Sequence, residues 1–263
     1  MAAISALYVY PIKSCRGVRV DDWPVVERGF AADRRWMIVN SAGLFVTQRE
    51  LPQLCRVGTR LHSDTIELTA PGNVPLSLPL TLEQGLSRTV RVWQDDTLGL
   101  VHAEGSAWFS RYLGAPLELV YMPDSARRAV NPERARPSDI VSFADGYPFL
   151  ILSEASLADL NARLQRPIAM ERFRPNIVVS GSEPYAEDGY QRVRLGEISF
   201  RGPKRCERCV ITTLDPETGE SGTEPLRTLA RYRLAEQKVW FGMNLIHDQP
   251  GRLRVGDMVT KIS

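Results

Sequence analysis

Short strand-like segments, separated by turn residues, run through the whole sequence and limit the folds that this chain can adopt. In the first part, up to about residue 122, such segments lie at residues 4–10, 36–40, 44–47, 55–61, 65–69 and 89–93. A helix is predicted at residues 105–113, because Gly114 follows as a C-terminal glycine should. Strands of this length and spacing predict a barrel or a sandwich.

The composition changes after this part. Residues 123–137 contain three prolines and show no periodicity, which indicates a loop or crossover. Beyond it, strands are predicted at residues 149–152, 176–180, 191–195, 198–202, 210–214, 239–246 and 253–262. Two helices are predicted, one capped by Ser153 and one capped by Thr223 that carries Pro225 in its first turn. We therefore expect a β-rich α+β fold of two coupled parts, residues 1–122 and 123–263.

Charge and hydropathy exclude several classes of protein. The net charge is +2, from 33 basic and 31 acidic residues, which argues against a general nucleic-acid binder. No apolar stretch approaches the ~20 residues that span a bilayer, and the first residues read as a strand rather than a secretory leader. Four cysteines are too few for a disulfide scaffold, so we expect a reducing cytoplasm and free thiols.

The most informative segment contains a C-x-x-C pair, Cys206 and Cys209, among four basic residues. Positive charge stabilises a thiolate, which is the ligand that a soft transition metal prefers. A structural zinc site is the first alternative, but it needs further ligands. The other cysteines and the histidines are scattered single residues: Cys15, Cys55, His62, His102 and His247.

Two other interpretations of the pair remain. A thioredoxin-like pair follows a strand and opens a helix. Here the pair precedes the strand predicted at residues 210–214, which argues against that motif. The second interpretation, that both cysteines are chemically inert, is not excluded by the sequence.

Polar residues at three other places suit an anionic ligand. Lys13 and Ser14 follow the first predicted strand, where an ammonium, a hydroxyl and backbone N–H groups can hold a phosphate. Arg34 precedes the strand at residues 36–40. Arg174 is followed by Pro175 and Asn176, and the proline fixes the turn from which the arginine projects. The residue pattern alone does not place these groups in one pocket.

The segments YPIKSCRG, DRRW, SEASLADLN, FRPN, RCERCVITTLDPETG and RVGD resemble, in this order, the MOSC-domain proteins with an N-terminal MOSC β-barrel. The sequence is similar to the mitochondrial amidoxime reducing components and the YcbX-like reductases. The resemblance covers almost the whole chain. It implies an N-terminal β-barrel domain at residues 1–122, packed against a C-terminal MOSC β-barrel with a few helices at residues 123–263.

The resemblance also assigns roles to residues. It implies that Cys209 coordinates molybdenum in a molybdenum–molybdopterin cofactor, and that Cys206 is not itself a ligand. It implies cofactor contacts at Lys13, Ser14, Arg34, Arg174 and Asn176. Ser153 is either a further cofactor contact or purely a helix cap, and we leave both open. Asp215 is a candidate proton donor, although an Asx turn explains it better.

The activity implied is reduction of N-hydroxylated or N-oxygenated small molecules by oxygen-atom abstraction. Because no ferredoxin-like domain is expected after residue 257, electrons would come from a separate iron–sulfur, haem or flavin protein. Because no targeting or anchoring segment is expected, we predict a soluble bacterial protein of the cytoplasm without nucleic-acid or membrane partners.

Two further functions remain open at this point. One is a molybdenum cofactor sulfuration module that uses a cysteine persulfide. In that case the pyridoxal phosphate associated with such sulfurases would belong to a desulfurase partner. The other is a non-catalytic zinc or cofactor-carrier module.

Overall fold

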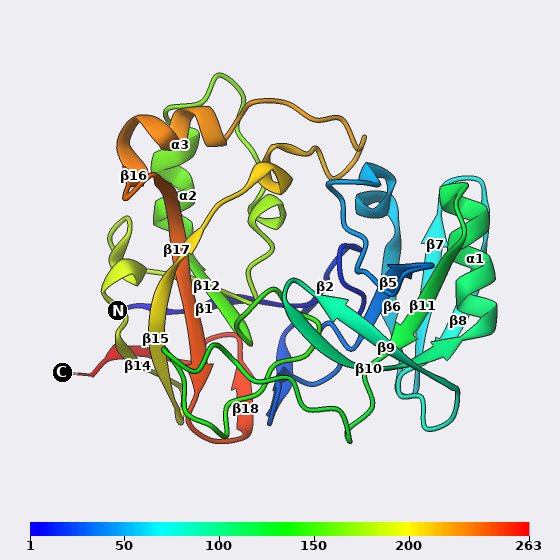
Figure 1. Cartoon of the computed structure of the whole chain (residues 1–263). Coiled ribbons are helices and arrows are strands. Elements are labelled where there is room, and N and C mark those ends of the chain that lie inside the picture. Colours follow the sequence, from blue (N-terminus) through cyan, green and yellow to red (C-terminus); the bar gives the residue numbers. More distant parts are fainter. Residues whose placement is uncertain (263) are drawn as a thin grey trace.

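A nine-stranded, mostly antiparallel sheet organises the larger lobe in the computed structural model, which describes residues 1–262. Its strand order places the chain's first strands beside strands from the second half (Figure 1). The strands, in spatial order, are β19 (Val259–Lys261), β14 (Arg192–Leu195), β15 (Ile198–Glu207), β17 (Lys238–His247), β12 (Phe149–Ser153), β13 (Ile177–Ser180), β1 (Ala3–Val9) and β2 (Val18–Val20), with β16 (Leu234–Ala235) paired to β17. Only the β12–β13 pair is parallel among these described strands.

The first strand, β1, explains why this sheet has a core on each face. Side chains alternate across a strand, so one strand can contribute apolar side chains to the layers on both faces of the sheet. Leu7 and Val9 pack into one cluster with residues of β12, β15 and β17. Ala6 and Tyr8 pack into another cluster, which contains Leu160 of helix α2 (Glu154–Asn161) and residues of helix α3 (Leu226–Arg233).

Three smaller sheets complete the fold. One sheet contains β5 (Trp36–Asn40), β11 (Leu117–Tyr121), β10 (Asp95–His102) and β9 (Leu86–Val92). Another contains β6 (Gly58–Leu61), β7 (Thr65–Ala70) and β8 (Asn73–Pro79). Together with helix α1 (Ala103–Leu113) they enclose a separate apolar cluster (Figure 1). The last sheet pairs β18 (Gly251–Arg254) with β3 (Asp22–Val26), which pairs in turn with β4 (Gly29–Phe30).

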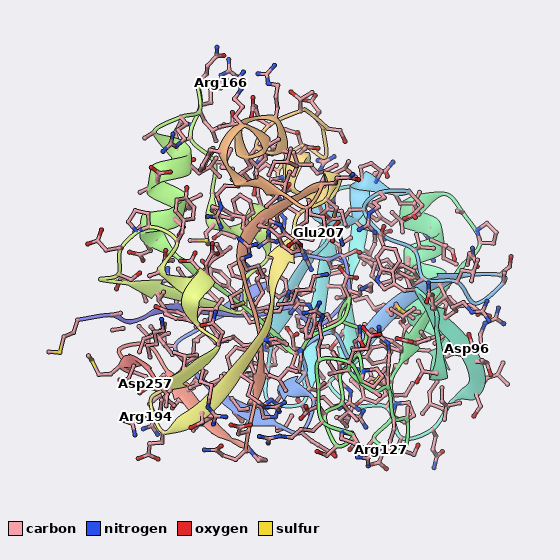
Figure 2. The ribbon with its side chains drawn as sticks, turned by 60° about the vertical axis from the view of Figure 1, so that its left-hand side comes forward. Asp96, Arg127, Arg166, Arg194, Glu207 and Asp257 are labelled. Carbon is pink, nitrogen blue, oxygen red and sulfur yellow. The ribbon has the colours of Figure 1, made fainter. Side chains whose placement is uncertain are left out.

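Charged side chains lie mainly on the outside of this framework. Asp96, Arg127 and Arg166 lie at the periphery, whereas Glu207 lies at the end of β15 near the middle of the view (Figure 2). The predicted β-rich α+β class is confirmed. The division at residue 122 stays a prediction, and the sheets cross it, because β1 pairs with β13 and β3 pairs with β18.

The helix predictions were right in place and partly wrong in detail. Helix α1 ends at Gly114, which has a φ of 68°, and the Ser153 hydroxyl accepts a hydrogen bond from the Ser156 N–H at the start of α2. Thr223 does not cap α3, since Pro225 occupies the N-cap position. There a Glu224 carboxylate oxygen accepts the Thr228 N–H at 3.0 Å instead.

Four strand predictions were wrong in whole or in part. Residues 44–47 form no strand, only isolated β-bridges at Leu44 and Phe45. The strand at residues 210–214 is a 3-10 helix, η4 (Val210–Thr213), because the hydroxyls of Thr212 and Thr213 donate to the carbonyls three residues earlier. Residues 55–61 begin within another 3-10 helix, η1 (Pro52–Arg56), which has proline in its first turn. The final strand at residues 253–262 is interrupted at Gly256, which has a φ of 94°.

Candidate functional site

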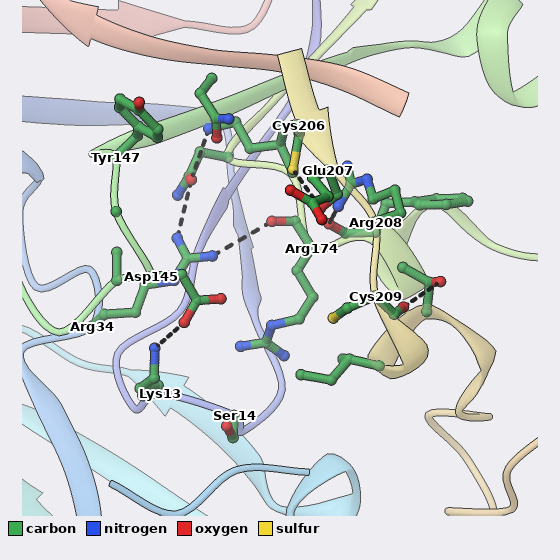
Figure 3. A pocket seen from close by; sticks show the side chains of 18 of the residues that line it. Lys13, Ser14, Arg34, Asp145, Tyr147, Arg174, Cys206, Glu207, Arg208 and Cys209 are labelled. Atoms are coloured by element: carbon green, nitrogen blue, oxygen red, sulfur yellow. Dashed lines mark hydrogen bonds and ion pairs between the residues drawn. The ribbon is translucent and has the colours of Figure 1, made fainter. Parts of the chain in front are cut away.

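Most of the site residues predicted from the sequence line one cleft of about 160 Å³ (Figure 3). Its lining includes Lys13, Ser14, Arg34, Arg174, Asn176 and Cys209. These residues come from the loop after β1, the turn before β5, the end of the 3-10 helix η2 (Met170–Phe173) and the segment after β15. Elements from both halves of the chain therefore build the cleft.

Lys13 is a buried cation, with 6% of its surface exposed. Its ammonium donates to the Phe143 carbonyl at 2.8 Å and to an Asp145 carboxylate oxygen at 2.5 Å. Burial alone would raise the pKa of Asp145, but the Lys13 charge and hydrogen bond, with the charge of Arg49, hold it well below its usual range. Asp145 therefore carries a negative charge at neutral pH and keeps Lys13 directed into the cleft.

Asn176 fixes the position of Arg34. The Asn176 side-chain oxygen accepts from Arg34 Nη1 at 3.0 Å and from the Leu150 N–H at 3.3 Å. Its side-chain nitrogen donates to the Tyr8 carbonyl and to Asp33, both at 3.2 Å. Both the oxygen and the nitrogen of this buried amide already have hydrogen-bond partners in the protein. Its geometry therefore suits holding Arg34 in position.

Tyr10 supports the two arginines of the cleft. The guanidinium carbon of Arg34 lies 4.3 Å from the centre of the Tyr10 ring, and that of Arg174 lies 4.4 Å from it. The Tyr10 hydroxyl donates to the Pro175 carbonyl at 3.0 Å. Arg174 also donates to the Cys15 carbonyl at 2.7 Å. The two charges are thus held on one buried aromatic ring.

The backbone at three of the predicted site residues is strained. Ser14, Arg34 and Arg174 have φ values of 71°, 49° and 55°. A non-glycine residue in this left-handed region costs on the order of 1–3 kcal/mol, and such residues concentrate at binding and active sites. The strain therefore supports a binding role for this cleft.

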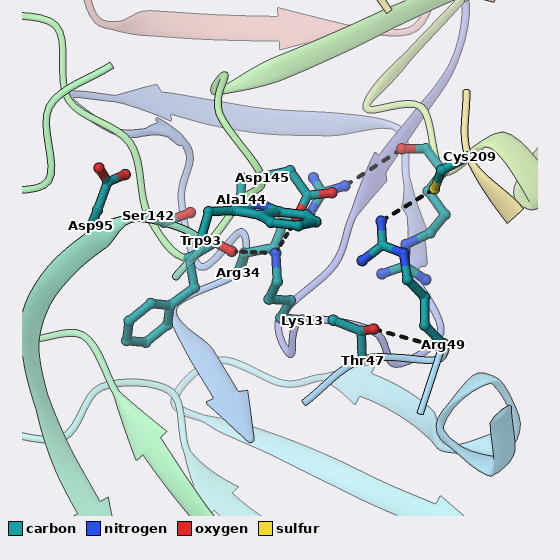
Figure 4. Close-up of polar contacts among 12 residues, drawn as sticks. Lys13, Arg34, Thr47, Arg49, Trp93, Asp95, Ser142, Ala144, Asp145 and Cys209 are labelled. Carbon is teal, nitrogen blue, oxygen red and sulfur yellow. Dashed lines mark hydrogen bonds and ion pairs between the residues drawn. The ribbon is translucent and has the colours of Figure 1, made fainter. Parts of the chain in front are cut away.

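Cys209 stands at the N-terminus of η4 and is partly exposed to the cleft. Its sulfur accepts a hydrogen bond from Arg49 Nη2 at 3.2 Å (Figure 4). Because η4 replaces the predicted strand, the pair does follow a strand and open a short helix. The sequence argument against a thioredoxin-like pair therefore loses its basis.

The other three cysteines have different surroundings, although all four are free thiols. Burial raises the pKa of Cys15 to about 12. Burial also raises the pKa of Cys55 and of Cys206. Cys206 lines the same cleft as Cys209, but its sulfur hydrogen-bonds only weakly, at 3.7 Å from the Glu207 carbonyl. Among these residues, Cys209 is thus the cysteine whose sulfur is both partly exposed to the cleft and hydrogen-bonded to a cation.

Ser153 and Asp215 lie outside the lining of this cleft. Ser153 is fully buried as the cap of α2. Asp215 accepts the backbone N–H groups of Glu217 and Thr218, as in an Asx turn, and pairs with Arg172 at 2.8 Å. The Glu217 N–H, more than any other partner, lowers the pKa of Asp215, so this carboxyl is ionised at neutral pH. Its geometry supports the turn interpretation over a proton-donor role.

The donor set of the cleft fits an anionic cofactor with a sulfur-bound metal. Five cations line it against two carboxylates: Lys13, Arg34, Arg172, Arg174 and Arg208, with Asp145 and Glu207. Among the described residues, Arg208 Nη2 is buried without a hydrogen-bond partner. A phosphate or pterin group would satisfy such donors, and the Cys209 thiolate is a ligand for a soft metal.

Sequence reasoning missed Tyr10, Arg49 and Asp145. Arg49 and Asp145 lie in no motif that signals a site, and Tyr10 opens the segment YPIKSCRG without a chemical feature that singles it out. Arg49 is 160 positions from Cys209 in the sequence, so only the fold brings them together. Gly17 could have pointed to Tyr10, because a Cβ at this position would lie 2.5 Å from the Tyr10 ring.

Residues 1–262 contain neither a membrane-spanning helix nor a cluster of metal-binding side chains. No helix in this range is long and apolar enough to cross a bilayer. Nor do three or more His, Cys, Asp and Glu side chains gather there as a metal-binding group.

Comparisons with known proteins agree with the motifs. The model of the MOSC N-terminal beta barrel domain matches residues 1–116, and that of the MOSC domain matches residues 138–260. The chain is 36% identical to the mitochondrial amidoxime-reducing component 1 of Homo sapiens, over 98% of this chain and 82% of that protein. It is 37% identical to the Mus musculus protein of the same name, again over 98% of this chain and 82% of that protein.

A longer protein matches as well. The molybdenum cofactor sulfurase of Solanum lycopersicum is 31% identical over 97% of this chain, but this chain spans only 35% of it.

Proposed function

The chain belongs to the family of MOSC-domain proteins that includes the mitochondrial amidoxime-reducing components, and from this premise we propose that it reduces N-hydroxylated small molecules with a molybdenum–molybdopterin cofactor. The observation that carries the proposal is the Cys209 thiol, which is partly exposed in a cationic cleft with Lys13, Arg34 and Arg174. The names of the relatives supply the reaction class.

Each part of the cleft has a role in this proposal. Cys209 provides a protein thiolate to molybdenum. Lys13, Arg34 and Arg174 bind the anionic pterin and its phosphate, and they offset its charge in a partly buried site. The cofactor, when bound, supplies two-electron redox chemistry at the metal, while the protein supplies binding and electrostatics.

The same geometry bears on water and protons. Asp145 is ionised, with its pKa held well below the usual range, and is hydrogen-bonded to Lys13, so it can orient a water beside the cleft but carries no proton to donate at neutral pH. Asp215 is held by an Asx turn outside the lining, which weakens its candidacy as the proton donor. Electrons come, in this proposal, from a separate iron–sulfur, haem or flavin protein.

A sulfuration role is the second candidate, and the match to the tomato sulfurase favours it. In that role the cleft would bind the cofactor while a cysteine carried a persulfide sulfur. Cys209 is the better carrier, because burial raises the pKa of Cys206 and so disfavours its thiolate.

Elemental analysis and turnover separate these functions. Native protein, Cys209→Ala and the matched control Cys206→Ala would be assayed for molybdenum, pterin, zinc and cyanide-releasable sulfur. Turnover of benzamidoxime would be measured with dithionite-reduced viologen. We expect molybdenum and pterin near one per chain, with turnover, in the native protein and in Cys206→Ala, and loss of both in Cys209→Ala.

The other outcomes decide against the reductase. Sulfane sulfur without bound metal would support the sulfuration module, and zinc alone would support a zinc module. A fully loaded protein that does not reduce benzamidoxime or any other N-hydroxylated compound tested would contradict the proposed activity.

A further inference from the structure

The contact between Arg49 and Cys209 points to a role beyond cofactor binding. Arg49 Nη2 lies 3.2 Å from the Cys209 sulfur, and no cysteine other than Cys209 accepts a hydrogen bond from an arginine among residues 1–262 (Figure 4). The two residues come from different halves of the chain. A guanidinium directed at a sulfur, and not at a carboxylate, requires a specific arrangement to hold it there.

A tight turn fixes the backbone of Arg49. Its N–H donates to the Thr47 hydroxyl at 3.1 Å. The Thr47 hydroxyl and N–H both donate to one Glu50 carboxylate oxygen, at 2.6 and 2.8 Å. Thr47 is 1% exposed, so this turn is anchored in the protein interior. The arginine side chain therefore starts from a defined position.

Trp93 packs against the guanidinium group of Arg49. The guanidinium carbon lies 5.0 Å from the centre of the Trp93 ring. Trp93 occupies the two-residue turn between β9 and β10 with a φ of 57°, and the residue is 48% exposed. The indole nitrogen donates to Asp145 at 3.3 Å, and Phe45 packs on the indole with ring centres 5.0 Å apart. A strained turn thus presents an otherwise solvent-facing ring to Arg49.

We propose that Arg49 tunes the metal-ligating sulfur of Cys209, with Trp93 as the positioning residue that holds Arg49 in place. This inference rests on the proposed function, in which Cys209 binds molybdenum. A hydrogen bond from a cation withdraws charge from a thiolate, so the sulfur donates less charge to its metal. Hydrogen bonds to ligand sulfurs are among the protein's means of setting a metal's reduction potential. Arg49 therefore raises the potential of the centre and eases its reduction by the electron donor.

The test is a redox titration of the metal followed by electron paramagnetic resonance, with molybdenum content and circular dichroism measured on the same samples. The variants are Arg49→Met, Arg49→Lys and Trp93→Leu. The matched control is Arg56→Met, which removes an exposed cation from the neighbouring helix η1. Circular dichroism separates a folding defect from a local effect.

We expect the midpoint potential to become more negative in Arg49→Met while at least half of the molybdenum is retained. Arg49→Lys should show a smaller shift, because an ammonium keeps the charge but lacks the planar fork that stacks on Trp93. Trp93→Leu should shift the potential in the same direction, and Arg56→Met should leave it unchanged. If Arg49→Met does not fold, the shift in Arg49→Lys decides the question.

Two results would overturn this inference. One is a midpoint potential equal to that of the native protein in loaded Arg49 variants. The other is loss of molybdenum from folded Arg49→Met and Arg49→Lys, which would mean that Arg49 holds the cofactor itself. Absence of molybdenum from the native protein would instead overturn the proposed function, so the two failures are distinguishable.

Discussion

Replacing Tyr10 tests whether one buried ring organises the cationic cleft. In Tyr10→Leu the guanidinium groups of Arg34 and Arg174 lose the ring that lies 4.3 and 4.4 Å from them. Each such interaction contributes about 0.5–2 kcal/mol. The hydrogen bond from the hydroxyl to Pro175 contributes about 1 kcal/mol more. The free energy of unfolding should therefore fall by about 2–5 kcal/mol.

Tyr10→Phe is the matched control, because it keeps the ring and removes only the hydroxyl. Its unfolding free energy should fall by about 1 kcal/mol. Urea denaturation measures both variants, and molybdenum analysis follows the site. We expect Tyr10→Phe to keep its molybdenum and Tyr10→Leu to lose more than half of it. Equal destabilisation of the two variants, with equal molybdenum content, would refute the claim that the ring positions the two arginines.

Two other substitutions probe single contacts. Asp145→Asn should lower the unfolding free energy at pH 7 by about 1 kcal/mol, a modest value because this carboxylate is 62% exposed in its pair with Lys13. Since the folded state depresses the Asp145 pKa, its stabilisation is complete above the unfolded pKa of about 4 and is lost progressively as the pH falls towards the lower folded pKa. Urea titrations at pH 7, 5 and 3 should show the same gap to the native protein at pH 7 and 5 and a narrower gap at pH 3. Ser153→Ala should cost about 1 kcal/mol as a lost helix cap and leave the molybdenum content unchanged; metal loss with an intact fold would instead favour a cofactor contact.

The strand pattern of the sequence predicted the class of the fold, because alternation and turn residues act locally. The prediction failed where side chains competed with the backbone pattern. Residues 210–213 are all β-branched, as in a strand, yet the Thr212 and Thr213 hydroxyls bond to preceding carbonyls and favour a 3-10 turn. No local signal distinguishes these two outcomes.

The candidate site was predictable only in part. Lys13, Arg34, Arg174 and Cys209 were assigned together through motif resemblance, and they do line one cleft. Their cofactor contacts remain predictions. Arg49 could not have been found in this way, because its partner Cys209 is 160 residues away and no short motif joins the two.

The central claim is that the Cys209 sulfur binds molybdenum. X-ray absorption at the molybdenum edge counts the sulfur atoms around the metal directly. The account predicts that Cys209→Ser, loaded with cofactor, has one sulfur fewer around molybdenum than the native protein, while Cys206→Ser has the same number as the native protein. An unchanged sulfur count in Cys209→Ser, or a loss in Cys206→Ser, would contradict it.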